Sequence, residues 1–154
     1  MAEPCPGCGL AAPDGTPDCQ AMFDELCVRA AAPPFTYPAR RKMVDTYCLQ
    51  HPDRYCVSAK SLAAHLTGLF CAFEHHSHPS VLEAQRRSLD GTPPLERPAL
   101  PAFRGPLTIA DAYHAPDAVS LVASVERWAR AVWEAYAPLH PLARRWTEQA
   151  LSGR

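Results

Sequence analysis

Two cysteines near the start of the chain are separated by a proline and a glycine, in the run Cys5-Pro6-Gly7-Cys8-Gly9. Thiolates spaced by two residues can bind one tetrahedral ion from a tight turn. Gly7 and Gly9 let the backbone turn so that its amide groups face the sulfur atoms. The run therefore predicts a zinc knuckle. Its competitors are two free thiols in a flexible tail, and a redox Cys-x-x-Cys pair, which would normally lie within an α/β pattern that this sequence lacks.

A closed tetrahedral site needs two further ligands. Cys19 is the best third ligand because it lies in the first turn of a predicted helix, where the positive helix end favours thiolate. Cys27 lies two turns further along the same helix, too far away to share the ion. For the fourth ligand we favour His51, with His65 as the alternate and Asp45 as a weaker oxygen ligand.

The two histidines have other interpretations as well. His51 and His65 fall on the apolar stripes of neighbouring predicted helices, so each could be a core histidine hydrogen-bonded to a backbone carbonyl or to Tyr47. Together with Asp45 they could also form an open metal site that activates water. No local motif, however, resembles that of a known hydrolase.

Apolar residues recur at helical spacing through most of the chain, and no segment shows the strong period of two that is typical of strands. We expect helices over residues 18–31, 38–50, 58–74, 79–89, 116–137 and 142–151, and a further helix start at 108–111. Thr16, Ser58 and Thr108 are the expected N-caps of three of them. Trp128 is expected at the edge of the buried face of its helix.

These elements predict an all-α fold, a small bundle of about five or six helices with an N-terminal zinc knuckle. We expect one domain over residues 1–154. It comprises a metal knuckle and loop (1–17), four helices (18–89), a proline-rich strap (90–107) and C-terminal helices (108–151). Leu95, Leu100 and Phe103 are expected to pin the strap to the surface.

Composition narrows the functional classes. The chain has 154 residues, 47% of them hydrophobic and 20% charged, which is typical of a globular protein. Its net charge of −1 argues against nucleic acid as a partner. We expect no export signal and no membrane span, because no apolar run of the required length is present. Seven cysteines in such a chain favour thiols and metal in the cytoplasm over disulfides.

The chain resembles a family of small bacterial proteins known as domain of unknown function 5946. The resemblance covers nearly the whole chain and is carried by Cys5-Pro6-Gly7-Cys8-Gly9, Cys19, Val44-Asp45-Thr46-Tyr47, Gln50-His51-Pro52, Ala64-His65-Leu66-Thr67-Gly68-Leu69, Thr108-Ile109-Ala110-Asp111 and residues 128–135. It implies that Cys5, Cys8, Cys19 and His51 match the family's metal positions, and it implies no activity. The chain departs from the pattern at Pro17-Asp18-Cys19-Gln20, where the family pattern has a glycine before the cysteine and an aromatic residue after it.

Three functions are compatible with these features. The first is a zinc-stabilised helical protein that acts as a structural, accessory or binding module for an unidentified protein or small-molecule partner. The second is a metal-dependent enzyme with a site near Asp45, His51 and His65. The third is a sensor that releases zinc when its thiolates are oxidised.

Overall fold

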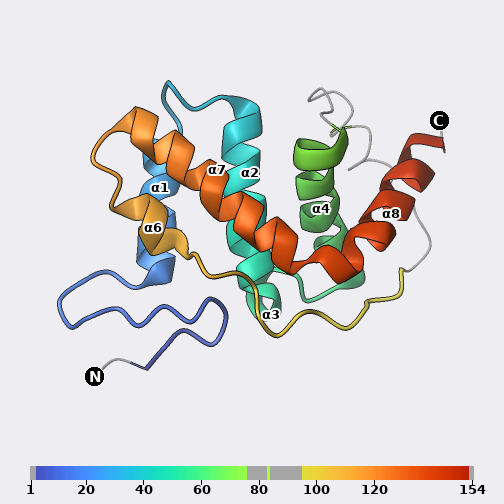
Figure 1. Cartoon of the computed structure of the whole chain (residues 1–154), viewed down its shortest axis with the longest axis horizontal. Coiled ribbons are helices and arrows are strands. Elements are labelled where there is room, and N and C mark those ends of the chain that lie inside the picture. The colour runs from blue at the N-terminus through green and yellow to red at the C-terminus, as the bar shows by residue number, and fades with distance from the viewer. Residues whose placement is uncertain (1–2, 76–82, 84–94, 153–154) are drawn as a thin grey trace.

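A computed structural model of the chain describes residues 3–75, 83 and 95–152 (Figure 1). Within these ranges the chain forms seven α-helices and no strand, which confirms the all-α prediction with slightly more helices than expected. The elements are α1 (Cys19–Arg29), α2 (Tyr37–Gln50), α3 (Pro52–Tyr55), α4 (Ala59–Phe70), the π-helical turn η1 (Cys71–His75), α6 (Ile109–Tyr113), α7 (Ala118–Ala135), the 3-10 turn η2 (Ala137–Leu139) and α8 (His140–Ser152). No helix in the described ranges is both long and apolar enough to cross a membrane.

Helix α2 is the centre of the fold. Every residue from Asp45 to Gln50 is buried, because α7 crosses one side of α2, α4 packs along another, and Phe23 of α1 stacks on Tyr47 with ring centroids 4.0 Å apart (Figure 1). Helix α8 packs on α4, and α6 joins α1 to α7. The end of α2 therefore lies where several segments meet, and His51 is the residue that follows it.

The helix starts follow capping chemistry, with one correction. Ser58 caps α4 and Thr108 caps α6, each in a reciprocal capping box, as the sequence predicts. The prediction that Thr16 caps the first helix is wrong. The cap is Asp18, whose Oδ1 accepts a hydrogen bond of 2.8 Å from the amide of Ala21, while the hydroxyl of Thr16 donates to the carbonyl of Pro13. As a result α1 begins at Cys19 itself.

Several helix boundaries differ from the prediction. Pro52 does end α2, but its fixed φ suits the first turn of a helix, so it also begins the short helix α3. The third predicted helix is α-helical only to Phe70 and continues as the π-helical turn η1 to His75. The helix expected over residues 79–89 lies outside the described residues except at position 83, which is helical.

Trp128 and the strap are anchored by one buried glutamine. Trp128, a core residue by its helical spacing with Trp133 and Tyr136, is fully buried rather than at the edge of its helix face. Its indole Nε1 donates a 2.9 Å hydrogen bond to Oε1 of Gln50. The Nε2 group of Gln50 donates to the carbonyls of Arg104 and Leu107 at 3.0 and 2.7 Å. These bonds hold the described part of the strap, residues 95–107, across the end of α2 (Figure 1).

The apolar side chains expected to hold the strap behave differently from one another. Leu95 and Leu100 are partly buried against the core, as expected. Phe103, by contrast, is 67% exposed, so the prediction that it pins the strap is wrong. The adjacent backbone is held by Gln50 instead, whose Nε2 donates to the carbonyl of Arg104.

Candidate metal centre

Three cysteines and one histidine converge where the N-terminal loop meets the helices. Cys5, Cys8, Cys19 and His51 each offer one ligand atom, and these atoms all lie within 4.8 Å of one another. We call this set the Cys3His cluster. Cys19 Sγ and His51 Nε2 are 3.5 Å apart. A tetrahedral zinc ion with bonds of about 2.3 Å to sulfur and about 2.0–2.1 Å to nitrogen sets these two atoms roughly 3.5–3.6 Å apart. The spacing therefore fits one ion.

The knuckle is a hydrogen-bonded turn. The amide of Gly9 donates to the carbonyl of Cys5 at 2.8 Å, and the amide of Cys5 donates to the carbonyl of Leu10 at 2.9 Å. Gly9 has a φ of 80°, a backbone conformation that residues other than glycine rarely adopt. The backbone amides of Gly7 and Cys8 point to the Cys5 sulfur, and the amide of Leu10 points to the Cys8 sulfur. The turn thus presents both sulfur atoms and supplies donors to each.

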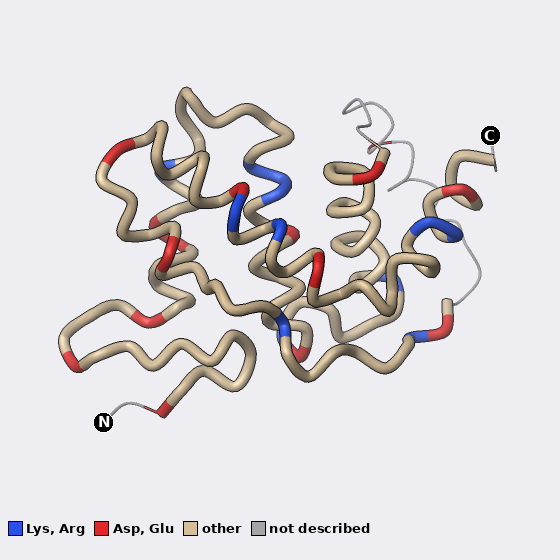
Figure 2. The backbone as a smooth tube through the Cα atoms, in the orientation of Figure 1, with Lys and Arg blue, Asp and Glu red and all other residues tan. Residues whose placement is uncertain are grey.

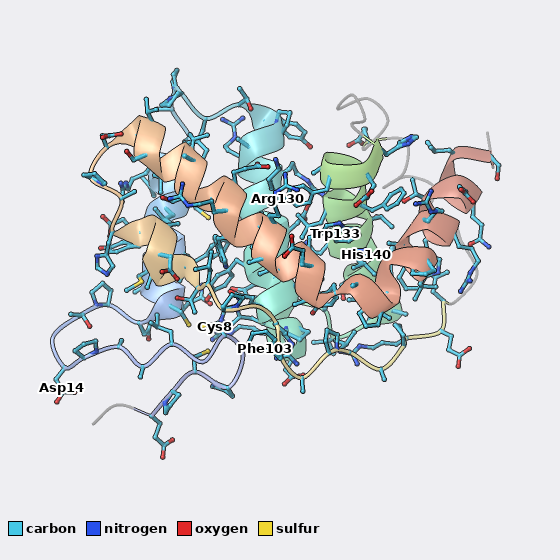
Figure 3. The ribbon with its side chains drawn as sticks, viewed as in Figure 1. Cys8, Asp14, Phe103, Arg130, Trp133 and His140 are labelled. Carbon is cyan, nitrogen blue, oxygen red and sulfur yellow. The ribbon has the colours of Figure 1, made fainter. Side chains whose placement is uncertain are left out.

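Gly7 lets the knuckle approach the end of α2. A Cβ atom at this position would lie 2.6 Å from Cδ2 of His51 and 2.7 Å from the carbonyl oxygen of Gln50, closer than side chains tolerate. The carbonyl of Gly7 accepts a 3.2 Å hydrogen bond from Nη1 of Arg104 in the strap. Figure 3 labels Cys8, which follows Gly7 in the knuckle, and Phe103, which precedes Arg104 in the strap. A side chain at position 7 would force these segments apart.

His51 is oriented so that one ring nitrogen faces the sulfur atoms. Its Nδ1 lies 2.8 Å from the carbonyl oxygen of Tyr47, which can only accept, so Nδ1 carries the proton. The Nε2 lone pair is then left for a metal, an arrangement common among histidine ligands. The ring stacks on Tyr47 with centroids 4.1 Å apart, and His51 is only 7% exposed.

The thiols differ in how readily they ionise without a cation. Burial opposes ionisation of Cys5, but hydrogen bonds from the amides of Cys8 and Gly7 outweigh it and lower the pKa of this thiol. Burial raises the pKa of Cys8 to about 12, and burial together with Cys5 raises the pKa of Cys19. Burial lowers the pKa of His51, which keeps the imidazole neutral as a metal requires. Three thiolates held this close need a cation to share.

Basic residues near the cluster come from other parts of the chain. Residues 3–28 contain no lysine or arginine, and their charged side chains are all acidic (Figure 2). The positive charges of Arg54, in α3, and Arg104, in the strap, both act on His51. Three thiolates with one divalent cation would carry a net charge of −1, which positive charge from these two guanidinium groups would help to offset.

A second layer of side chains was not foreseen from the sequence. The Gln20 Oε1 atom accepts hydrogen bonds from Arg54 at 2.7 Å and from the Tyr55 hydroxyl at 2.9 Å, with the Tyr47 hydroxyl at 3.4 Å. This network joins α1, α2 and α3 beside Cys19. Two sequence signals were available: Gln20 directly follows Cys19, and Tyr47 lies one helical turn before His51.

The other candidate ligands lie in a separate group. His65 Nδ1 donates a 2.8 Å hydrogen bond to Oδ1 of Asp45, and Arg41 Nη2 lies 3.5 Å from the same oxygen. We call these three residues the Asp45 cluster. The structure therefore separates His51 from the other two members of the expected Asp45–His51–His65 site. Within residues 3–75, 83 and 95–152, the Cys3His cluster is the one group of three or more His, Cys, Asp or Glu side chains spaced to hold a metal.

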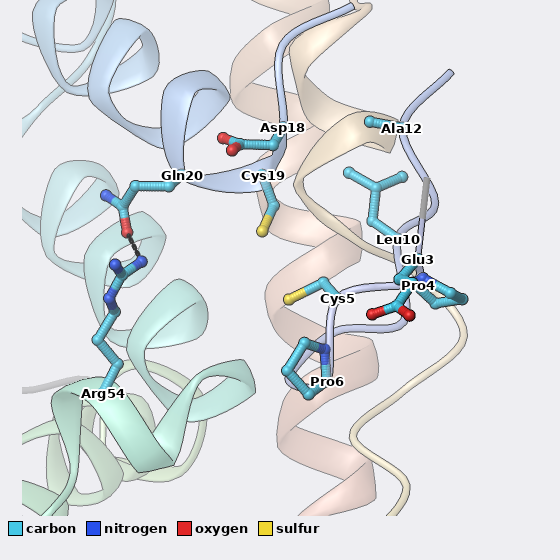
Figure 4. A pocket seen from close by; sticks show the side chains of 10 residues that line it. All are labelled: Glu3, Pro4, Cys5, Pro6, Leu10, Ala12, Asp18, Cys19, Gln20 and Arg54. Atoms are coloured by element: carbon cyan, nitrogen blue, oxygen red, sulfur yellow. Dashed lines mark hydrogen bonds between the residues drawn. The ribbon is translucent and has the colours of Figure 1, made fainter. Parts of the chain in front are cut away.

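Two pockets border the Cys3His cluster. One has a volume of about 350 Å³ and is lined by residues that include Cys5, Cys19, Gln20 and Arg54 (Figure 4). The other, of about 230 Å³, is lined by Cys5, Pro6, Gly7, His51 and residues 52–54 of α3. Cys27 is exposed on α1 and is not part of the cluster, as the sequence predicts.

Comparison with known proteins gives a family but no function. No curated protein and no solved structure matches the chain. One family model matches residues 3–137, a span that includes all four members of the Cys3His cluster, and it is described as a family of unknown function (DUF5946). With most of its length matched, the chain belongs to this family.

Proposed function

We propose that the Cys3His cluster binds one zinc ion as a closed structural site, and that the protein is a zinc-stabilised helical module that binds a partner rather than an enzyme. The observation that carries the proposal is that four ligand atoms from three separate segments lie within 4.8 Å of one another. Three thiolates and an imidazole are the donors that zinc prefers, and four protein ligands leave no position open for water.

The ion would tie the knuckle, which makes few other contacts, to α1 and to the end of α2. Cys5 and Cys8 lie in the knuckle, Cys19 begins α1, and His51 ends α2. The knuckle has no helix or strand of its own, and Leu10 is its one apolar side chain packed against the core apart from the ligands. Its attachment therefore depends on the metal and on the Arg104 bond to Gly7. Metal-binding energy in such a site becomes folding energy.

Catalysis receives less support than a structural role. An enzyme would need an open coordination position or a free acid or base near the ion. The side chains expected to supply one, Asp45 and His65, are hydrogen-bonded to each other. We also propose a reducing, cytoplasmic setting, because Cys5, Cys8 and Cys19 are arranged as metal ligands, which must be reduced to bind an ion. The partner, a protein or a small molecule, is not identified by the site.

Metal content and thermal stability test the proposal together. Protein purified under reducing conditions should contain one zinc per chain, and Cys8→Ser should lose both zinc and stability. Loss of a structural metal is among the largest single-site effects, about 4 kcal/mol or more. For a chain of this length that corresponds to a fall in Tm of roughly 8–16 °C. Cys27→Ser, which changes an exposed cysteine outside the cluster, is the matched control and should change neither quantity.

Two results would count against the structural role. Wild-type protein that is fully folded without metal would show that the cluster does not need an ion. Complete loss of zinc from Cys8→Ser with no change in Tm would show that the ion binds without stabilising the fold.

A further inference from the structure

Cys5 is the one cysteine of the Cys3His cluster that lines both neighbouring pockets. It lines the pocket of about 350 Å³ and also the pocket of about 230 Å³. Cys19 lines only the larger of the two, and Cys8 lines neither. The susceptibility of a cysteine to a small oxidant follows its thiolate character and its exposure. A small molecule in either pocket can therefore reach Cys5.

Cys5 and Cys19 meet at the wall of the larger pocket. Figure 4 shows their side chains turned toward one another, one from the knuckle and one from the first turn of α1. Their sulfur atoms lie within 4.8 Å of each other, and a disulfide bond is about 2.05 Å long. A closing movement of less than about 3 Å would therefore join them.

The chain between these two cysteines can follow that movement. It contains no helix or strand before α1 begins, and Leu10 is its one apolar side chain packed against the core. Cys5 and Cys8, by contrast, lie in one turn that is fixed by the bonds from Gly9 to the Cys5 carbonyl and from Cys5 to the Leu10 carbonyl. A disulfide between them would have to form within that fixed turn, and departures from ideal disulfide geometry cost strain energy.

The larger pocket suits a small neutral oxidant. Glu3 and Asp18 give it acidic lining groups, and Arg54 gives it a basic one. Three thiolates beside it would add negative charge, which repels an anionic reagent. Hydrogen peroxide carries no charge and is small enough for this space, so neither the lining nor the thiolates would exclude it.

We propose that Cys5 is an oxidation site for small neutral peroxides that enter through the larger pocket, and that Cys19 completes the reaction by forming a disulfide with Cys5. The inference rests on the proposed zinc site, and it assigns sulfur atoms to the zinc-releasing oxidation that the sequence allows. The Cys5 thiolate first bonds to a peroxide oxygen, the O–O bond breaks and hydroxide leaves, which gives a sulfenic acid. The Cys19 thiolate then attacks the Cys5 sulfur, the S–S bond forms and a second hydroxide leaves. The two thiolates lose two electrons, and the peroxide gains them.

The disulfide would replace one cross-link with another. Cys8 and His51 would remain as donors, too few for a closed zinc site, so the ion would leave. The new bond would still hold the knuckle to α1, because it closes a ring over residues 5–19. The oxidised, metal-free protein should therefore have a Tm roughly 6–12 °C above that of the reduced, metal-free protein.

The experiment uses the zinc-loaded full chain carrying Cys27→Ser, which removes an exposed thiol that could join two chains. One equivalent of hydrogen peroxide is added while a chromogenic chelator records zinc. The remaining thiols are then blocked with N-ethylmaleimide under denaturing conditions. We expect one zinc to be released for each disulfide that forms.

Peptide mapping without reduction identifies the disulfide. A protease that cleaves before aspartate releases residues 1–13, which carry Cys5 and Cys8, and residues 18–23, which carry Cys19. We expect these two peptides to be joined. Fragmentation of the joined pair should place the maleimide on Cys8, because Cys5 is then the partner of Cys19.

Filling the larger pocket tests the route of the oxidant. Ala12 lines this pocket, so Ala12→Leu should keep one zinc per chain and slow its release by peroxide roughly 3-fold or more, because access limits thiol oxidation. Ala11→Leu is the matched control, since Ala11 is exposed and does not line the pocket. It should keep the rate of the parent protein.

The outcomes distinguish this inference from the proposed function. Protein without zinc overturns both. Zinc-loaded protein that keeps its zinc in peroxide, or that forms its first disulfide within residues 1–13 or between Cys8 and Cys19, overturns the inference alone, and this result needs no pocket variant. Equal rates for Ala12→Leu and Ala11→Leu overturn entry through the larger pocket.

Discussion

The Cys3His cluster and the Asp45 cluster both hold polar side chains between helices, and each contains one of the two histidines that the sequence offers as a metal ligand. In the Asp45 cluster the carboxylate and the histidine are paired with each other. His65 donates to a carboxylate that is 1% exposed, and Arg41 places a guanidinium group 3.5 Å from the same oxygen. In the Cys3His cluster the ligand atoms face one another with three thiols and one bare nitrogen lone pair. The first group is held together by its own hydrogen bond, whereas the second has the arrangement of a candidate metal site.

Each cluster also depends on a glycine for close approach. A Cβ at Gly68 of α4 would lie 2.1 Å from Asp45 Oδ2, and a Cβ at Gly7 would lie 2.6 Å from His51 Cδ2. Gly68 costs helix stability, about 1 kcal/mol relative to alanine. It allows the buried carboxylate to lie against the helix backbone. The comparison teaches that the role of a histidine on an apolar stripe depends on what its ring nitrogens face. Nδ1 of His65 faces a carboxylate, whereas Nε2 of His51 faces a group of thiols.

The largest expected contrast is between the two histidines. His51→Ala should weaken zinc binding by more than about 100-fold. Loss of a residue that only hydrogen-bonds to a ligand typically costs about 10–100-fold, and His51 is itself a proposed ligand. His65→Ala should keep full zinc content but lower the free energy of unfolding by about 1–3 kcal/mol, because Asp45 loses a buried donor. Competition against a chromogenic chelator measures the first quantity and urea unfolding measures the second.

The reverse pattern would break the comparison. Zinc lost from His65→Ala and kept by His51→Ala would identify His65 as the fourth ligand, the alternate that the sequence left open. Both variants keep the helical segments around them, so circular dichroism should show the same helix content as the wild type in each case.

The two glycines should give a smaller and separable effect. Gly68→Ala forces the Asp45 carboxylate or α4 to move, an overpacking cost of about 1–3 kcal/mol, and should lower Tm by roughly 2–12 °C with zinc retained. Gly7→Ala should instead lower zinc affinity, because it pushes the knuckle away from His51. Thermal unfolding with and without a chelator distinguishes the two.

Gly9→Ala provides the control for the knuckle. A Cβ at Gly9 meets nothing within 4 Å, so this change adds only the strain of a positive φ, about 1 kcal/mol. Equal losses of zinc affinity from Gly7→Ala and Gly9→Ala would show that turn conformation, rather than the approach to His51, governs the site.

The sequence predicted more of the cluster than of its surroundings. Ligand spacing pointed to Cys5 and Cys8, and helical periodicity pointed to Cys19 at the start of a helix and to His51 one turn after Tyr47. The structure brings these four residues together. Periodicity places a residue on a stripe but does not show what faces it. It could not show that Asp45 and His65 pair between helices, that Gln50 meets Trp128, or that Asp18 outcompetes Thr16 as a cap. A glycine within an apolar helix, as at Gly68, was an available sign of close packing.

The smallest expected effect concerns the charge around the centre. Arg104→Gln removes a guanidinium that bonds to Gly7 and acts on His51, but it leaves the Gln50 bonds to the strap backbone in place. A partly exposed charge is worth about 0.5–1 kcal/mol, so zinc affinity should fall only about 2- to 5-fold, and less at high salt. Arg97→Gln is the control, because Arg97 bonds to the carbonyl of Cys56 from the same strap. If both variants weaken zinc binding equally, the strap acts by holding the knuckle in place. If only Arg104→Gln does so and salt reduces the difference, the guanidinium balances the negative charge of three thiolates sharing one cation.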